Sequence, residues 1–218
     1  TQLFNSQTRL YTPDAGSIGF DGHSLLGLQT HQIAALGIGR TFQNVALFSS
    51  MTVLENVMVG RHCRTHTGYF ANAFRAMSVV KEEASVRSRA MELLSLLKLD
   101  AVAHEAVADL TFATKKRVEL ARALASEPQL LLLDEPAGGL NHSEVEELQA
   151  LIQGLRDKLD LSVLLVEHHL NMVMRISDQV VAIDFGRKIA DGHPKEVQGN
   201  KDVIQAYLGG ERACGTSW

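Results

Sequence analysis

The chain has 218 residues, a net charge of −4 and a sequence pI of about 6.1. Hydrophobic residues make up 45% and charged residues 21%, which is ordinary for a globular protein with a buried core. The acidic balance argues against a nucleic-acid binder, because phosphate contacts need a concentrated basic surface. No apolar run approaches the ~20 residues of a membrane-spanning helix, so we expect any membrane role to come through partner proteins.

The first half of the chain changes from strand signals to helix signals. Strands are predicted around residues 17–20 and 37–42. Thr52 and Glu55 have the spacing of a capping box, which predicts a helix through about Val59. A longer helix is predicted over about residues 80–97. We therefore interpret residues 44–112 as a mainly helical insertion in an α/β core.

Two continuous apolar runs of strand length, residues 130–133 and 161–166, follow in the second half. Such runs are typical of parallel strands that are covered on both faces. Between them, Ser143 and Glu146 have capping-box spacing and precede an amphipathic stripe, which predicts a helix. The three segments together predict a βαβ unit. Residues 179–190 predict a further strand with a short hairpin partner.

Each apolar run ends in a polar cluster, Asp134-Glu135-Pro136 and Glu167-His168-His169. In open parallel sheets, ligands bind outside the carboxyl ends of the strands. One carboxylate of the Asp134-Glu135 pair can hold a Mg²⁺-bound water while the other accepts a proton from an attacking water. His168 can contact a phosphate and orient that water. The alternatives are an acidic turn and a structural histidine.

Two further segments are candidates for phosphate or metal contacts. Gln43 follows a predicted strand, and its amide oxygen can join a metal shell, although a solvent-facing loop glutamine is the alternative. Residues 110–117 precede a helix predicted over 118–125 and include three consecutive cations, which oppose the helix dipole. An anion at that helix start would relieve the conflict, and a solvated charged face is the alternative.

Four motifs in this order carry a family resemblance: RTFQ, LTFATKKRVELARAL, LLLLDEPAGGLN and LLVEHH. The ordered set resembles that of the ATP-binding-cassette (ABC) ATPases. The resemblance implies an α/β fold, a P-loop NTPase core with a mainly parallel sheet, plus a helical subdomain. It places the core in residues 1–43 and 113–192, the helical subdomain in 44–112 and a C-terminal helical tail in 193–218.

The resemblance assigns catalytic and metal-binding roles, with ATP and Mg²⁺ as the implied cofactors. Asp134 matches the Walker B aspartate and Glu135 the general-base glutamate. His168 matches the switch histidine that contacts the γ-phosphate. Gln43 matches the Q-loop glutamine, which touches the metal and faces the transport subunit. Residues 1–16 look like the helix after the phosphate-binding loop, so Thr1 would be the Mg²⁺-binding hydroxyl.

Three more residues match motifs at the seam of an ATPase dimer. Thr111 and Ala113 fall on the serine and the second glycine of the signature motif, which binds the nucleotide held by the opposite subunit. Asn141 matches the D-loop. Because alanine replaces the signature glycine at Ala113, we expect weakened hydrolysis, and a non-catalytic or regulatory subunit stays an alternative.

The phosphate-binding loop GxxxxGK[ST] does not occur in the sequence. We expect it to precede Thr1, and we expect the present 218-residue chain alone to bind ATP poorly and to be inactive. The backbone N–H groups and the lysine of this loop normally hold the β- and γ-phosphates of ATP.

Within the ABC ATPases, the sequence is similar to the branched-chain amino-acid transporter ATPases. Four segments carry this similarity: RTFQNVALFSSMTVLENVMVG, DEPAGGLN, VEHH and DVIQAYLGG. The resemblance implies a peripheral subunit at the cytoplasmic face of the cell membrane. Its partners would be a second ATPase subunit, two permease subunits and an external substrate-binding protein. The lipopolysaccharide-export ATPases share the YLG ending and are the alternative within the family. DNA-handling ATPases are disfavoured because the sequence lacks sustained heptads.

Overall fold

The computed structural model describes residues 2–41, 46–62 and 77–208. The chain divides into two compact units, Thr1–Val166 and Glu167–Trp218, and each is described by itself. The subdomain boundaries expected from the sequence stay predictions.

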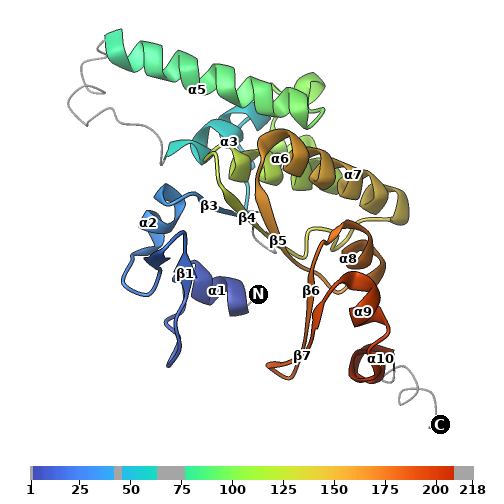
Figure 1. Ribbon diagram of the computed structural model, residues 1–218. Coiled ribbons are helices and arrows are strands. Elements are labelled where there is room, and N and C mark those ends of the chain that lie inside the picture. The colour runs from blue at the N-terminus through green and yellow to red at the C-terminus, as the bar shows by residue number, and fades with distance from the viewer. Residues whose placement is uncertain (1, 42–45, 63–76, 209–218) are drawn as a thin grey trace, which may run out of the picture. The chain divides into compact units, whose positions relative to one another are not determined.

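The first unit contains a three-stranded parallel sheet (Figure 1). Its strands, in spatial order, are β3 (Ile38–Arg40), β4 (Leu130–Asp134) and β5 (Ser162–Val166). Helix α7 (His142–Leu159) joins β4 to β5, which confirms the predicted βαβ unit. Leu131, Leu132 and Leu133 are at most 1% exposed. Burial on both faces of the sheet therefore explains why this strand is apolar throughout.

Short elements precede the sheet. They are α1 (Gln2–Gln7), β1 (Gly19–Phe20), β2 (His23–Ser24) and α2 (Thr30–Ala35). Asp21 and Gly22 connect β1 to its antiparallel partner β2, with φ of 48° and 74°. A two-residue turn with both φ positive favours Asp-Gly, because glycine has no Cβ to oppose a left-handed backbone. Phe4 of α1 packs in one buried cluster with Ile38 and Leu132, so α1 is anchored to the sheet.

The helical part of the first unit follows β3. It comprises α3 (Val53–Gly60), α5 (Met77–Leu96), the 3₁₀ helices η2 (Asp100–Val102) and η3 (Val107–Asp109), and α6 (Phe112–Leu124). Thr52 and Glu55 form the predicted capping box, with Glu55 Oε2 2.8 Å from the N–H nitrogen of Thr52. Helix α3 contacts α6 at Gly60, where an added Cβ would clash with the carbonyl oxygen of Arg122. Only glycine allows this approach.

Helices α6 and α7 begin earlier than the sequence predicted. Helix α6 begins at Phe112, because the Thr111 side chain caps it by accepting the Thr114 N–H at 3.3 Å. Helix α7 is capped by Asn141 and Glu144, not by Ser143 and Glu146. Both pairs have the same three-residue spacing, so the spacing alone did not distinguish them. The turn after β4 ends at Leu140, and that brings the chain into the helix two residues sooner.

In its described residues, up to 208, the second unit consists of a hairpin and three helices. Its elements are α8 (Leu170–Ile176), β6 (Val180–Asp184), β7 (Arg187–Gly192), α9 (Pro194–Gln198) and α10 (Lys201–Leu208). Strands β6 and β7 are antiparallel and turn at Phe185 and Gly186, which confirms the predicted hairpin. The core of the unit is a buried cluster of Val180, Ala182, Val197 and Val203, which joins the hairpin to α9 and α10.

Among the described helices, none combines the length and the apolar character that crossing a bilayer requires.

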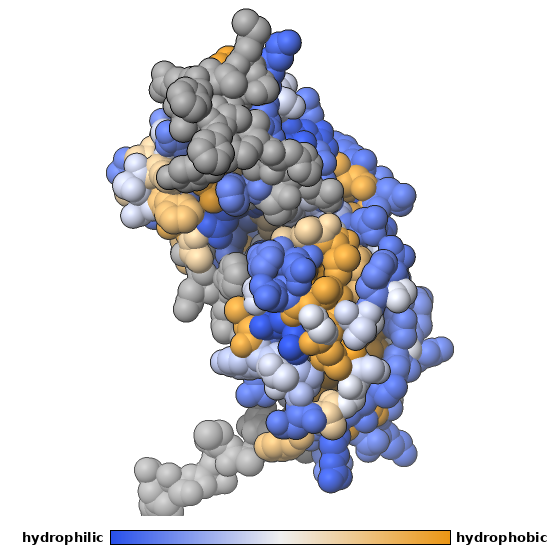
Figure 2. Space-filling model, turned by 90° about the vertical axis from the view of Figure 1, so that its left-hand side faces the viewer, coloured by the Kyte–Doolittle hydropathy of each residue, from blue (hydrophilic) through white to orange (hydrophobic). Residues whose placement is uncertain are grey.

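On the face in Figure 2, hydrophobic residues form an area bordered by hydrophilic ones. In the first unit the exposed apolar side chains include Leu3, Leu10, Tyr11 and Phe48, which are 49–59% exposed. Exposed apolar side chains of this kind are ordinary on protein surfaces.

Candidate functional site

Asp134 and Glu135 lie at the carboxyl end of β4, as the sequence predicted. Asp134 is the last residue of the strand and is 1% exposed. Glu135 is half-buried and has a left-handed backbone with φ of 48°. Its N–H donates to the Val166 carbonyl at 2.8 Å, so the end of β5 fixes the backbone at this point. A left-handed backbone costs a non-glycine residue about 1–2 kcal/mol, and such strain is concentrated at functional sites.

Arg40, which the sequence analysis did not single out, is the charged partner of Asp134. Arg40 Nη2 lies 3.1 Å from Asp134 Oδ2, and the two side chains are 6% and 0% exposed. The partners are 94 residues apart in the chain, so no local pattern reveals the pair. The strand signals at residues 37–42 and 130–133 were the available information, and parallel pairing of the two strands brings their ends together.

The segment Thr111–Arg117 forms the first turns of α6. Thr111 is exposed at the cap, and Ala113 is half-buried within the helix. The three cations, for which a bound anion and a solvated charged face were the alternatives, each have a contact within the protein. Lys115 Nζ donates to the Ala108 carbonyl at 3.0 Å, Lys116 lies 5.5 Å from the Phe112 ring centroid, and Arg117 pairs with Glu147.

Asn141 is exposed and begins α7. Its Oδ1 accepts the Glu144 N–H at 3.0 Å, and Glu144 Oε2 accepts the Asn141 N–H at 2.9 Å. The preceding turn contains Gly139, with φ of 81°. This reciprocal cap fixes the end of the segment in which the sequence predicts the D-loop.

His168 belongs to the second unit, where its side chain is 62% exposed. The Glu167 carboxylate accepts the N–H groups of His168 and His169 at 3.1 and 3.3 Å. These three residues offer metal-ligand atoms within 4.8 Å of one another. Glu167 Oε2 already accepts these two backbone hydrogen bonds, which limits its availability to a metal ion. The position of His168 relative to Glu135 stays a prediction.

Thr1 and Gln43, which the sequence analysis assigned to the metal, lie outside the described residues. The segment that contains Gln43 is bounded by Thr41 and Ala46. The Ala46 carbonyl accepts a hydrogen bond from Arg122, a residue of α6 whose pKa is lowered by burial. Helix α6 therefore holds the residue that follows this segment.

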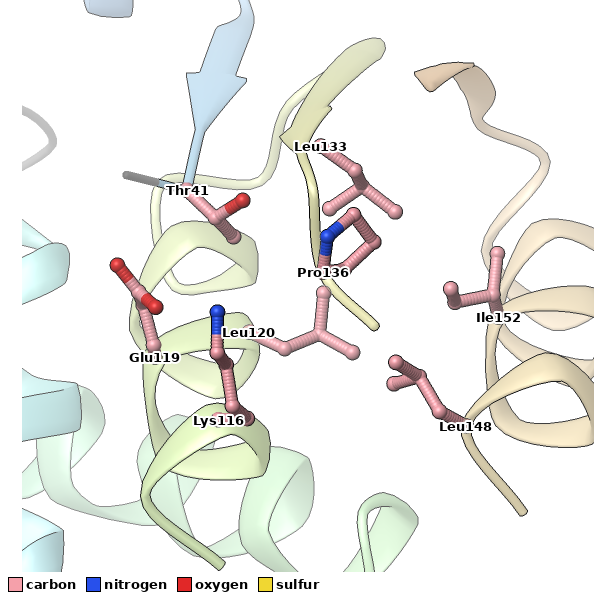
Figure 3. Close-up of a pocket in the computed structure, with 8 residues that line it drawn as sticks. All are labelled: Thr41, Lys116, Glu119, Leu120, Leu133, Pro136, Leu148 and Ile152. Carbon is pink, nitrogen blue, oxygen red and sulfur yellow. The ribbon is translucent and has the colours of Figure 1, made fainter. Parts of the chain in front are cut away.

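A small cavity lies beside Thr41 (Figure 3). Lys116 and Glu119 of α6 direct their charged ends toward Thr41, while Leu148 and Ile152 of α7 form the apolar side. The cavity has room for about one water molecule, with a volume of ≈ 10 Å³. Ligand pockets are roughly 300–1,000 Å³, so this cavity is not a nucleotide site.

The family follows from comparison with known proteins. A family model described as ABC transporter matches residues 1–138, which is more than half of the chain. The chain belongs to the ABC transporter family. A second model, described as branched-chain amino acid ATP-binding cassette transporter, matches residues 187–213.

Relatives within the ABC transporter family cover almost the whole chain. The chain is 41% identical to the high-affinity branched-chain amino acid transport ATP-binding protein BraF of Pseudomonas aeruginosa. It is 39% identical to the corresponding protein LivG of Escherichia coli K12. In both comparisons the match covers 96% of this chain and 82% of the relative. The chain is therefore an ATP-binding subunit of the ABC type, as its motifs predicted.

Solved structures of ABC cassettes share the fold. The ADP conformation of MJ1267, an ATP-binding cassette of an ABC transporter, superposes with a TM-score of 0.80 at 28% identity. The match covers 95% of this chain and 82% of that one. A nucleotide-free ATP-binding cassette from an ABC transporter gives a TM-score of 0.78 at 27% identity, covering 94% of this chain and 82% of that one. The predicted α/β P-loop NTPase fold is confirmed.

Proposed function

We propose that this protein is the ATP-hydrolysing subunit of an importer for branched-chain amino acids. It would work at the cytoplasmic face of the cell membrane with a second ATPase subunit, two permease subunits and an external binding protein. The similarity to BraF and LivG along the chain supports the cargo and the partners. The observation that carries the catalytic assignment is the buried Asp134 beside the strained Glu135 at the end of β4.

The residues at the end of β4 fit a magnesium ion bound together with ATP. Asp134 supplies a carboxylate oxygen, the ligand type that Mg²⁺ prefers, and it would hold a metal-bound water. The ion would neutralise charge on the phosphates during transfer. Gln43 and Thr1 are the other proposed ligands.

Glu135 would act as the general base, and His168 would orient the attacking water and contact the γ-phosphate. A general base must lie within hydrogen-bond reach of the proton that it takes. The bond from the Glu135 N–H to Val166 fixes the Glu135 backbone beside the metal-binding Asp134. This constraint supports the division of roles between the two adjacent carboxylates.

The Glu135→Gln variant of the full-length protein tests this assignment. ATP binding is expected to stay within about threefold of wild type, while hydrolysis falls by about 10²–10⁴-fold, the usual contribution of a general base. Glu83→Gln is the matched control, because Glu83 is exposed on α5 away from the end of β4. Retention of wild-type hydrolysis in Glu135→Gln would contradict the assignment.

The cargo is tested separately in proteoliposomes that contain the complete transporter. We expect ATP-dependent uptake of leucine, isoleucine and valine, and no uptake with the Glu135→Gln subunit. If none of the three amino acids is taken up while ATP hydrolysis is intact, the proposed cargo is wrong and the proposed ATPase activity still stands.

Because alanine stands at position 113, where the signature motif has glycine, we expect a slower variant of the same activity. Ala113 lies within α6, where alanine is more favourable than glycine by about 1 kcal/mol, so the helix accommodates the Cβ. The remaining effect of the Cβ would be on the approach of the backbone to a phosphate. We expect Ala113→Gly to raise ATP turnover of the full-length protein, and an unchanged turnover would show that the replacement is neutral.

A further inference from the structure

Arg40 connects the end of β3 to the side chains of Asn5, Thr8 and Asp134 in the first unit. Its guanidinium is almost fully buried and pairs with Asp134, the proposed Mg²⁺ ligand. The same guanidinium donates from Nη1 to Thr8 Oγ1 at 2.7 Å and from Nη2 to Asn5 Oδ1 at 2.8 Å. The Arg40 side chain therefore links the carboxyl end of β4 to helix α1 and to Thr8, which follows this helix.

One acceptor of this network, Thr8, is itself held in place. Thr8 is 8% exposed, and its hydroxyl donates to the Phe4 carbonyl at 2.8 Å. With its single proton committed to Phe4, the hydroxyl is oriented to accept the bond from Arg40. The Arg40 guanidinium also lies 5.7 Å from the centroid of the Phe4 ring, within cation–π range.

Stability alone does not account for a charged pair at this position. A buried ion pair is often no more stabilising than apolar residues of the same volume, because both charges lose their hydration. An arginine fork nevertheless gives fixed directions to several acceptors at once, which a lysine ammonium does not. The geometry therefore suits orientation of the Asp134 carboxylate.

We propose that Arg40 is a positioning residue for Mg²⁺-dependent ATP hydrolysis, which holds the Asp134 carboxylate in a fixed orientation relative to helix α1. This inference rests on the proposed function, because it takes Asp134 as a metal ligand. Arg40 acts through Asp134 and needs no contact with the nucleotide. Its loss is expected to change the requirement for the metal more than the affinity for ATP.

The test measures how ATP hydrolysis by the full-length protein depends on Mg²⁺ concentration. In Arg40→Gln, the Mg²⁺ concentration for half-maximal rate is expected to rise at least tenfold. ATP binding measured in excess EDTA is expected to change less than threefold. Arg40→Lys keeps the charge and loses the fork, so its Mg²⁺ requirement should lie between those of wild type and Arg40→Gln.

Two more variants separate positioning from folding. Thr8→Val removes one acceptor and leaves the Arg40–Asp134 pair in place, so a smaller rise in the Mg²⁺ requirement is expected. Arg61→Gln is the control, because Arg61 pairs with Glu127 and not with Asp134. Its Mg²⁺ requirement should equal that of wild type. Circular dichroism and thermal unfolding identify any variant that fails to fold.

The outcomes distinguish this inference from the proposed function. An unchanged Mg²⁺ requirement in folded Arg40→Gln overturns the positioning role, and so does a lower requirement, which would mean that Arg40 competes with the metal for Asp134. If instead the wild type shows no Mg²⁺-dependent hydrolysis, or Asp134→Asn retains full activity, the proposed function itself fails.

Discussion

The Phe112 ring lies against Gly139, and a Cβ added to Gly139 would be 2.8 Å from Phe112 Cε1. Phe112 begins α6, next to the predicted signature residues Thr111 and Ala113. Gly139 belongs to the turn between β4 and α7, in which the D-loop is predicted, and it has φ of 81°. Two segments assigned to a dimer seam are thus in direct contact within one chain.

Gly139→Ala is expected to destabilise the protein by about 1–2 kcal/mol in urea unfolding, because alanine opposes a left-handed backbone. Phe112 is 48% exposed, so its ring can rotate away and the backbone sets most of the cost. Gly154→Ala is the matched control, since this glycine lies in α7 with nothing within 4 Å of an added Cβ. That control should stabilise the helix by up to about 1 kcal/mol. Equal effects of the two substitutions would contradict the assignment of strain to Gly139.

Asn56 is expected to be required for the fold of the segment before α3. It is 0% exposed, its Oδ1 accepts the Phe48 N–H at 2.8 Å, and its Nδ2 donates to the Phe48 and Thr52 carbonyls at 3.0 and 2.9 Å. Asn56→Leu removes these bonds at similar volume. A buried unsatisfied polar group costs about 1–3 kcal/mol, so we expect a loss of roughly 2–4 kcal/mol in the free energy of unfolding.

Asn56→Asp should be at least as harmful as Asn56→Leu, because a carboxylate would face two carbonyl oxygens. The exposed Asn171→Leu is the control and should change the free energy of unfolding by less than about 0.5 kcal/mol. Hydrogen exchange of residues 46–52 should speed up in the Asn56 variants. Unchanged exchange there would show that other contacts hold the segment.

The sequence predicted elements whose signals are local. The four leucines before Asp134 predicted a buried parallel strand, and the structure places Asp134 at its end. The spacing of Thr52 and Glu55 predicted the start of α3. Capping boxes satisfy backbone N–H groups within four residues, so the sequence alone contains the information.

Features that depend on distant residues were missed. The link from Arg40 to Asp134 spans 94 positions, and only the assembled sheet brings the two together. The sequence predicted this helix over residues 118–125, whereas α6 begins at Phe112. In the fold Arg117 pairs with Glu147 of α7, 30 residues away in the chain, and this contact offsets the dipole term of a few tenths of a kcal/mol.

Lys98→Gly is expected to stabilise the protein by about 0.5–1 kcal/mol. Lys98 lies just after the end of α5 in a left-handed conformation with φ of 57°. Its N–H donates to Ser95 O at 3.1 Å and the Leu99 N–H donates to Leu94 O at 2.8 Å, the bond pattern of a Schellman motif. Glycine relieves the strain at this position, whereas Lys98→Ala keeps the Cβ and should change stability little. Thermal unfolding of the three proteins decides, and the prediction is wrong if glycine and alanine behave alike.

Glu127 should make the stability of the first unit depend on pH. Its carboxylate accepts hydrogen bonds from Arg61 at 2.8 Å and from Arg89 at 3.2 Å. The bond from Arg61 contributes most to lowering the pKa of Glu127 below its ordinary value of 4.5. A carboxyl group with a lower pKa in the folded state stabilises the fold above its unfolded pKa and loses this contribution as the pH falls through the folded pKa.

The difference in free energy of unfolding between wild type and Glu127→Gln should therefore be constant near neutral pH and shrink as the pH falls below 4.5, the ordinary value of Glu127. The Glu127 side chain is 41% exposed, so solvent screening limits the difference to about 1 kcal/mol or less, and added salt should reduce it further. Repeating the substitution in an Arg61→Gln background should give a smaller difference, because the strongest partner is gone. Urea unfolding of the four proteins from pH 7 to pH 3 measures both effects, and a difference that persists at pH 3 would locate the contribution of Glu127 in packing instead of charge.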